Sequence, residues 1–94
     1  MLWWIFVGSK GGKMRAKIIS KIMEKPMNAH QLAQALNVNY RTITHHVDIL
    51  LEHNLISGEG PKYGTIYFPS KILESNFQSL RELIYRGLDS TERV

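Results

Sequence analysis

The chain has 94 residues, of which 44% are hydrophobic and 21% are charged, so it is long enough for one domain with a single modest core. It contains no cysteine, which excludes disulfide bonds, thiolate metal sites and cysteine nucleophiles. The formal net charge is +4, and this favours a polyanionic partner.

Most of the positive charge lies in the first third of the chain. Residues 1–27 carry six basic side chains against one acidic side chain, Glu24, which gives +5. Residues 28–69 sum to −1 and residues 70–94 to zero. One edge of the molecule should therefore be basic, which indicates either a surface for a polyanion or simply a solvated helix face.

The chain opens on seven consecutive apolar residues, MLWWIFV. A membrane helix needs roughly 20 such residues, and a secretory signal needs a basic start and a longer apolar run. We therefore expect a cytoplasmic protein with no membrane partner. Residues 1–12 are predicted to form an apolar segment that packs on its own core or on a second subunit.

Residues 13–69 carry the pattern of three helices and a hairpin. Apolar residues from Met14 to Met23 follow a helical period, which stops before Pro26. Asn28 and Gln31 predict a capping box at the start of a short second helix.

Asn37 suits the positive φ of a tight turn after that helix. A third helix should begin at the N-cap Asn39 and end near residue 53, with Ile43, Val47 and Leu50 on its buried face. Two short helices joined by a tight turn are the helix-turn-helix arrangement.

The remainder of the chain predicts a hairpin and a last helix. Residues 55–57 and 65–68 have strand composition, and GEGPKYG between them is rich in turn residues. Ser70 suits the N-cap of a helix over residues 70–88, followed by a polar tail at 89–94. The predicted fold is α+β, mainly α: a single winged helix-turn-helix domain with a two-stranded wing and a C-terminal dimerisation helix.

The stretch NAHQLAQALNVNYRTITHHVDILLEHNLI resembles the DNA-binding core of ArsR-type winged-helix transcriptional regulators, specifically their archaeal cysteine-free branch. The opening WWIFVGSKGGKMRAKII and the wing EGPKYGTIYF are similar to that branch as well. The resemblance implies a homodimer that binds double-stranded DNA, with its third helix in the major groove and its wings on the flanking backbone. Relatives commonly have glycine where this chain has Asn37 and Asn54, and many carry a base where it has Asp48.

If the apolar face of the third helix points inward, the opposite face presents candidate DNA contacts. Arg41 can donate two hydrogen bonds to guanine, Thr44 can reach a base edge, and Tyr40 can donate to a phosphate. Lys62 and Tyr63 at the wing tip suit a flanking phosphate, and the start of the first helix adds basic side chains. The full predicted DNA-binding set is Tyr40, Arg41, Thr42, Thr44, His45, Lys62, Tyr63, Lys13 and Arg15.

The adjacent histidines raise a competing metal hypothesis. His45 and His46 diverge by about 100° on a helix, and His46 lies two turns from His53, whereas helical metal sites use an i, i+4 spacing. We therefore predict no metal and no cofactor, with His45 facing the groove. His46 is expected to be half-buried, with its ring donating to a phosphate or to a backbone carbonyl.

The last helix has more apolar residues than a small monomer can cover, so we expect a homodimer. The predicted dimerisation residues are Trp3, Trp4, Phe6, Leu73, Phe77, Leu80 and Ile84. An alternative function is a protein-interaction module of the transcription machinery without a specific DNA site, which Asp48 on the presumed reading face favours. We expect no enzyme, since no catalytic constellation is present, and the sequence identifies no effector.

Overall fold

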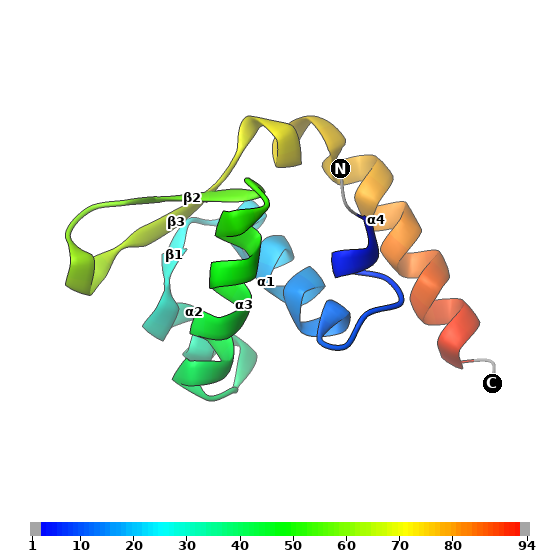
Figure 1. The fold of residues 1–94 in the computed structure, drawn as a ribbon, viewed down its shortest axis with the longest axis horizontal. Helices are drawn as coiled ribbons and strands as arrows, with labels where there is room; N and C mark the ends of the chain where they lie inside the picture. The colour runs from blue at the N-terminus through cyan, green and yellow to red at the C-terminus, as the bar shows by residue number, and fades with distance from the viewer. Residues whose placement is uncertain (1–2, 93–94) are drawn as a thin grey trace.

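The computed structural model describes the backbone of residues 3–92 and the side chains of residues 4–86. Its elements in chain order are the 3-10 turn η1 (Trp3–Ile5), helix α1 (Gly12–Glu24), strand β1 (Met27–Asn28), helix α2 (Ala29–Leu36), helix α3 (Tyr40–Glu52), strand β2 (Ile56–Glu59), the 3-10 turn η2 (Lys62–Gly64), strand β3 (Ile66–Pro69) and helix α4 (Lys71–Glu92). The β2–β3 hairpin extends from one side of the molecule, and α4 lies on the other (Figure 1). This α+β, mainly helical fold is the one that the sequence predicts.

Local hydrogen bonds build the turn between α2 and α3. The Asn28 side chain accepts from the backbone N–H of Gln31 at 2.8 Å, and the Gln31 side chain accepts from the N–H of Asn28 at 2.9 Å, so the expected capping box forms. Asn37 ends α2 in the left-handed conformation, with a φ of 54°. Asn39 then caps α3 by accepting from the N–H of Arg41 at 2.7 Å. These contacts confirm the predicted helix-turn-helix.

The wing belongs to a sheet of three strands in the order β1-β3-β2. Strands β2 and β3 pair antiparallel, with Ser57 opposite Phe68, and β1 pairs with the other edge of β3, with Met27 opposite Tyr67. The sequence predicted only the two strands of the hairpin. Strand β1 has two residues, which is too short to show an alternating pattern.

One core joins all the helices. Its fully buried side chains are Ile5, Ile18, Ile19, Ile22, Leu32, Ile43, Val47, Leu50, Leu55, Leu73 and Leu80. Burying one such side chain contributes about 1.5–3 kcal/mol, so this shared core fixes how α3 is held against α1. The predicted inner face of α3 is therefore confirmed.

Helix α4 begins after Ser70, whose hydroxyl accepts from the N–H of Leu73 at 3.1 Å. It continues to Glu92, beyond the predicted end at residue 88, so most of the expected polar tail is helical. None of the helices within residues 3–92 combines the length and the apolar composition that spanning a bilayer requires.

Candidate nucleic-acid interface

The outward face of α3 carries a row of polar side chains. Because the apolar side of this helix is in the core, Arg41, His45 and Asp48 are exposed on the other side, at spacings of four and three residues. Thr42 is also exposed. The Thr44 hydroxyl donates to the Arg41 carbonyl at 3.1 Å, which fixes the side chain beside the row. This face can present two donors from a guanidinium, a ring nitrogen and a hydroxyl to a partner.

The start of α3 and the wing line a common cleft. The Tyr40 and His30 rings are stacked, with centroids 4.4 Å apart and an interplanar angle of 18°. The cleft beside them has a volume of about 110 Å³ and is also lined by Lys62 and Tyr63 from η2. Tyr63 is 97% exposed at the wing tip. The structure therefore brings Tyr40, Lys62 and Tyr63, which were predicted separately, around one opening.

Tyr67 belongs to the same cleft and was missed by sequence reasoning. Burial raises the pKa of its hydroxyl, and the Asp48 carboxylate and the Tyr40 hydroxyl raise it further. The hydroxyl is therefore kept protonated and can donate a hydrogen bond. The strand composition of residues 65–68 was visible in the sequence, but the packing that brings Tyr67 into a cleft with Tyr40 of α3 was not.

Arg15 corrects one of the predicted DNA contacts. Its side chain is 3% exposed, and its Nε donates to the Ile5 carbonyl at 2.6 Å. Its Nη2 donates to the Ser9 hydroxyl at 2.9 Å and to the Lys10 carbonyl at 3.1 Å. All three guanidinium nitrogens have partners within the protein, since Nη1 contacts His46, so Arg15 holds the fold together and does not face a ligand.

His46 is 7% exposed, so it is more deeply buried than expected, and its hydrogen bond also differs from the expected one. Its Nδ1 lies 3.1 Å from Nη1 of Arg15. A guanidinium can only donate, so Nδ1 accepts and the proton of the neutral ring is on Nε2. Burial lowers the pKa of His46, and the positive charge of Arg15 and the His45 ring lower it further. The prediction that this ring donates to a phosphate or to a backbone carbonyl was wrong for Nδ1, which accepts a hydrogen bond from Arg15.

The histidine rings contact neighbouring rings. The His45 ring meets the His46 ring at 5.1 Å, and the His53 ring meets the Trp4 ring edge-on at 5.9 Å. Among the described side chains, no group of three histidine, cysteine, aspartate or glutamate residues could hold a metal ion.

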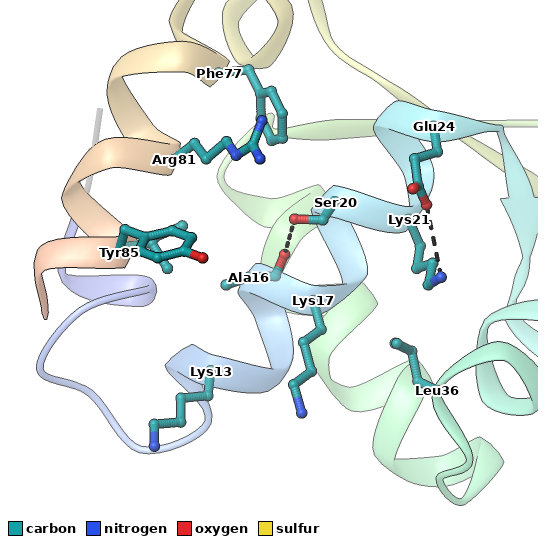
Figure 2. Close-up of a pocket in the computed structure, with 11 residues that line it drawn as sticks. Lys13, Ala16, Lys17, Ser20, Lys21, Glu24, Leu36, Phe77, Arg81 and Tyr85 are labelled. Carbon is teal, nitrogen blue, oxygen red and sulfur yellow. Dashed lines mark hydrogen bonds and ion pairs between the residues drawn. The ribbon is translucent and has the colours of Figure 1, made fainter. Parts of the chain in front are cut away.

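Lys13 is exposed, but the structure places it away from the row on α3. It lines a groove between α1 and α4, together with Lys17, Arg81 and Tyr85 (Figure 2). Figure 2 shows Arg81 and Tyr85 pointing from α4 toward α1. Lys13 therefore belongs to a different surface from Arg41 and His45.

The predicted dimerisation residues differ in how deeply a single protomer buries them. Phe6, Leu73 and Leu80 are at most 4% exposed and are core residues of a single protomer, which corrects their assignment. Phe77 and Ile84 are partly buried at the edge of that core. Trp4 is 56% exposed, and the side chain of Trp3 lies outside the described residues.

The predicted dimerisation set leaves out three apolar side chains of α4 that are exposed: Ile72, Leu83 and Tyr85. They fall outside the set Leu73, Phe77, Leu80 and Ile84, whose four-three-four spacing is that of a coiled-coil seam and predicted the dimerisation residues of this helix. Their helical positions, on the flanks of that seam, are the signal that could have found them.

A capped helix-turn-helix, a polar outward face on its second helix and a β-hairpin beside that face define a winged helix-turn-helix domain. The family model described as "Bacterial regulatory protein, arsR family" matches residues 12–57, from the start of α1 into β2. No curated protein matches the chain significantly. Residues 12–57, just under half of the chain, are thus similar to the helix-turn-helix domain of the ArsR family of regulatory proteins.

Proposed function

We propose that the protein binds double-stranded DNA sequence-specifically, as a homodimeric transcriptional regulator in the cytoplasm. Helix α3 enters the major groove, and the wing lies on the flanking backbone. The observation that carries this proposal is that Arg41 and His45 of the row, with Thr44 beside them, lie on a helix whose other face is buried in the core. A rigid helix can hold donors in register with base edges.

The cleft beside the recognition helix supports the same proposal. Lys62 and Tyr63 at the wing tip, with Tyr40 at the start of α3, offer an ammonium group and two phenol hydroxyls. Such groups position a protein on phosphates without reading sequence. A phosphate contact here would set the register in which Arg41 meets a base.

The homodimer is supported by apolar side chains that a single protomer leaves exposed. Trp4 is 56% exposed, Ile72 53% and Leu83 40%. We propose that Ile72 and Leu83, on one flank of α4, join a two-fold interface with Trp4. Two recognition helices about 34 Å apart would then fit a near-palindromic site. Leu83→Glu should give a monomer in sedimentation equilibrium, whereas Glu82→Gln should leave the dimer intact.

The placement in an archaeal, cysteine-free branch is also a proposal. It rests on the opening and wing sequences, which are similar to that branch, and on the absence of cysteine from the chain. The family match itself covers only residues 12–57.

Fluorescence anisotropy with mixed-sequence duplex DNA tests the proposal. A dimer that contacts about 6 phosphates should give a log–log salt slope near −5. Arg41→Ala should weaken binding to a selected site by about 5- to 150-fold, since a bidentate guanine contact contributes about 1–3 kcal/mol. Arg86→Ala, which removes an exposed arginine of α4, is the matched control and should bind like the wild type.

The alternative is a protein-interaction module that uses the same face of α3. Asp48 is exposed on that face, close enough to Tyr67 to affect its pKa, and an acidic side chain there opposes close contact with phosphates. Absence of DNA binding even at low salt would support this alternative and refute the regulator.

A further inference from the structure

Helices α1 and α4 enclose a groove that the proposed DNA interface does not use. Its volume is about 570 Å³, within the range of roughly 300–1,000 Å³ that is typical of small-molecule sites. Its lining includes four apolar side chains from three helices: Ala16 of α1, Leu36 of α2, and Phe77 and Ile84 of α4. The groove therefore offers an apolar surface of the size that an organic molecule fills.

The same groove is lined by an excess of positive charge. Lys13, Lys17, Lys21 and Arg81 line it, against the single acid Glu24 (Figure 2). Within the part of the chain that the structure describes, the one ion pair joins Lys21 to Glu24 at 3.7 Å. Among the described side chains, the three cations Lys13, Lys17 and Arg81 around this apolar surface have no acidic partner. Such a concave site concentrates small anions.

We propose that this groove binds a small carboxylate with an apolar body, such as a medium-chain fatty acid. The hydrocarbon would cover Phe77 and Ile84, and the carboxylate would be held by Lys13 and Lys17, at the end of the groove away from Arg81 (Figure 2). A neutral apolar molecule would cover the same surface and leave the cations unpaired. The combination of apolar lining and cationic rim therefore selects an amphiphilic anion.

A second copy of the chain fits this groove less well. A two-fold interface places the same patch of both subunits together. Lys13, Lys17 and Arg81 would then face a surface with the same excess of cations. Ile72 and Leu83 do not line the groove, so a two-fold interface on their flank of α4 leaves the groove available to a ligand.

Isothermal titration calorimetry of the full chain with decanoate, and with decanol as the uncharged analogue, tests the proposal. Decanoate should bind at least about tenfold more tightly than decanol. Lys13→Gln/Lys17→Gln should weaken decanoate binding by about 5- to 10-fold, as expected for two exposed ion pairs. Lys10→Gln/Lys25→Gln removes the same charge from exposed positions that do not line the groove and should bind like the wild type.

A second pair of variants tests the apolar side of the groove. Tyr85 on α4 and Ile66 on β3 are both exposed, but only Tyr85 lines the groove. Tyr85→Ser should weaken decanoate binding about 3-fold or more, and Ile66→Ser should leave it unchanged. Because both residues are exposed, these variants test the groove without relying on a change in the core.

Three results would overturn the proposal. They are no binding of decanoate, equal binding of decanol, and equal weakening by the control lysine variant. A fourth overturning result would come from sedimentation of Tyr85→Ser. If this change dissociated a wild-type dimer, the groove would be an interface between two copies of the chain. No DNA is present in these measurements, so their outcome is independent of the proposed regulator function.

Discussion

Nη1 of Arg15 lies 3.1 Å from Nδ1 of His46, and the two side chains are only 3% and 7% exposed. Arg15 comes from α1 and His46 from α3, the helix that we propose reads DNA. The same guanidinium donates to the carbonyl of Ile5, so it also holds the N-terminal segment. One side chain therefore links three parts of the chain whose relative positions set the direction of the recognition helix.

Replacing this guanidinium should destabilise the protein. Arg15→Met keeps much of the volume but leaves the carbonyls of Ile5 and Lys10 without their donor. We expect the free energy of unfolding to fall by about 2–4 kcal/mol, measured by urea denaturation followed by circular dichroism. Lys17→Met, on the exposed side of the same helix, should change it by no more than about 0.5 kcal/mol. Equal losses in both variants would contradict the structural function of Arg15.

The stability of the protein should depend on pH through His46. Its pKa in the folded state is lowered, so the unfolded chain binds the proton more readily, and stability rises with pH between the lowered pKa and the ordinary value of about 6.5. Protonation would also place an N–H donor against the Arg15 donor. The urea midpoint should therefore be lower at about pH 5.5 than at about pH 7.5.

His46→Asn isolates this contribution, because its amide oxygen can accept from Arg15 but cannot take up a proton. The variant should lose most of the pH dependence between these two values. His30→Asn exchanges an exposed ring and should retain the wild-type response. A full pH dependence in His46→Asn would show that another group controls it.

Two glycines before α1 test the packing around this pair. Both have a positive φ, 81° at Gly8 and 84° at Gly11, so alanine at either should cost about 1–2 kcal/mol of backbone strain. A Cβ at Gly8 would meet nothing within 4 Å, whereas one at Gly11 would lie 2.6 Å from Cε1 of His46. Gly11→Ala should therefore lower the free energy of unfolding by about 1–3 kcal/mol more than Gly8→Ala. Equal costs would mean that the ring of His46 moves aside freely.

The helix boundaries were predictable because local chemistry fixes them. Asn28, Asn37 and Asn39 act through hydrogen bonds or backbone angles within a few residues, and the capping and turn patterns identify them directly. The exposed row on α3 followed from the same local reasoning, since burying Ile43 and Val47 determines what faces outward.

The functions of Arg15, Leu73 and Leu80 depended on tertiary packing. A lysine or arginine in a basic helix is usually exposed, and nothing near Arg15 in sequence indicates that Ile5 and His46 surround it. The four-three-four seam of α4 predicted an apolar face correctly. Whether that face meets its own core or a second copy depends on where the helix lies in the fold, which periodicity does not encode.

The wing tip should contribute to affinity without contributing to sequence preference. Lys62 is exposed in η2, and we propose that it contacts a phosphate. Lys62→Gln should weaken binding to all duplexes alike and reduce the log–log salt slope by about 1 for each protomer bound. Lys71→Gln, at the start of α4, should leave the slope unchanged. A loss confined to one DNA sequence would instead assign Lys62 to a base.

We expect Asp48 to limit how closely α3 approaches DNA. It is exposed in the same row as His45, and its carboxylate should repel phosphates by about 1 kcal/mol at a separation of about 4 Å in water. Asp48→Asn should therefore raise DNA affinity by about 5-fold at low salt, and by less as salt is added, in the anisotropy assay. Glu74→Gln makes the same change in net charge on α4 and should have little effect.

The direction in which Asp48→Asn changes DNA affinity also distinguishes two possible functions of the Asp48 side chain. Repulsion from the backbone predicts a gain that is similar for every duplex, because it acts on phosphates. A carboxylate that accepts from the amino group of a cytosine predicts a loss of about 1–3 kcal/mol at one base pair and none elsewhere. The second result would make Asp48 part of the reading face, and the departure from a basic residue at this position would then set which operator the protein prefers.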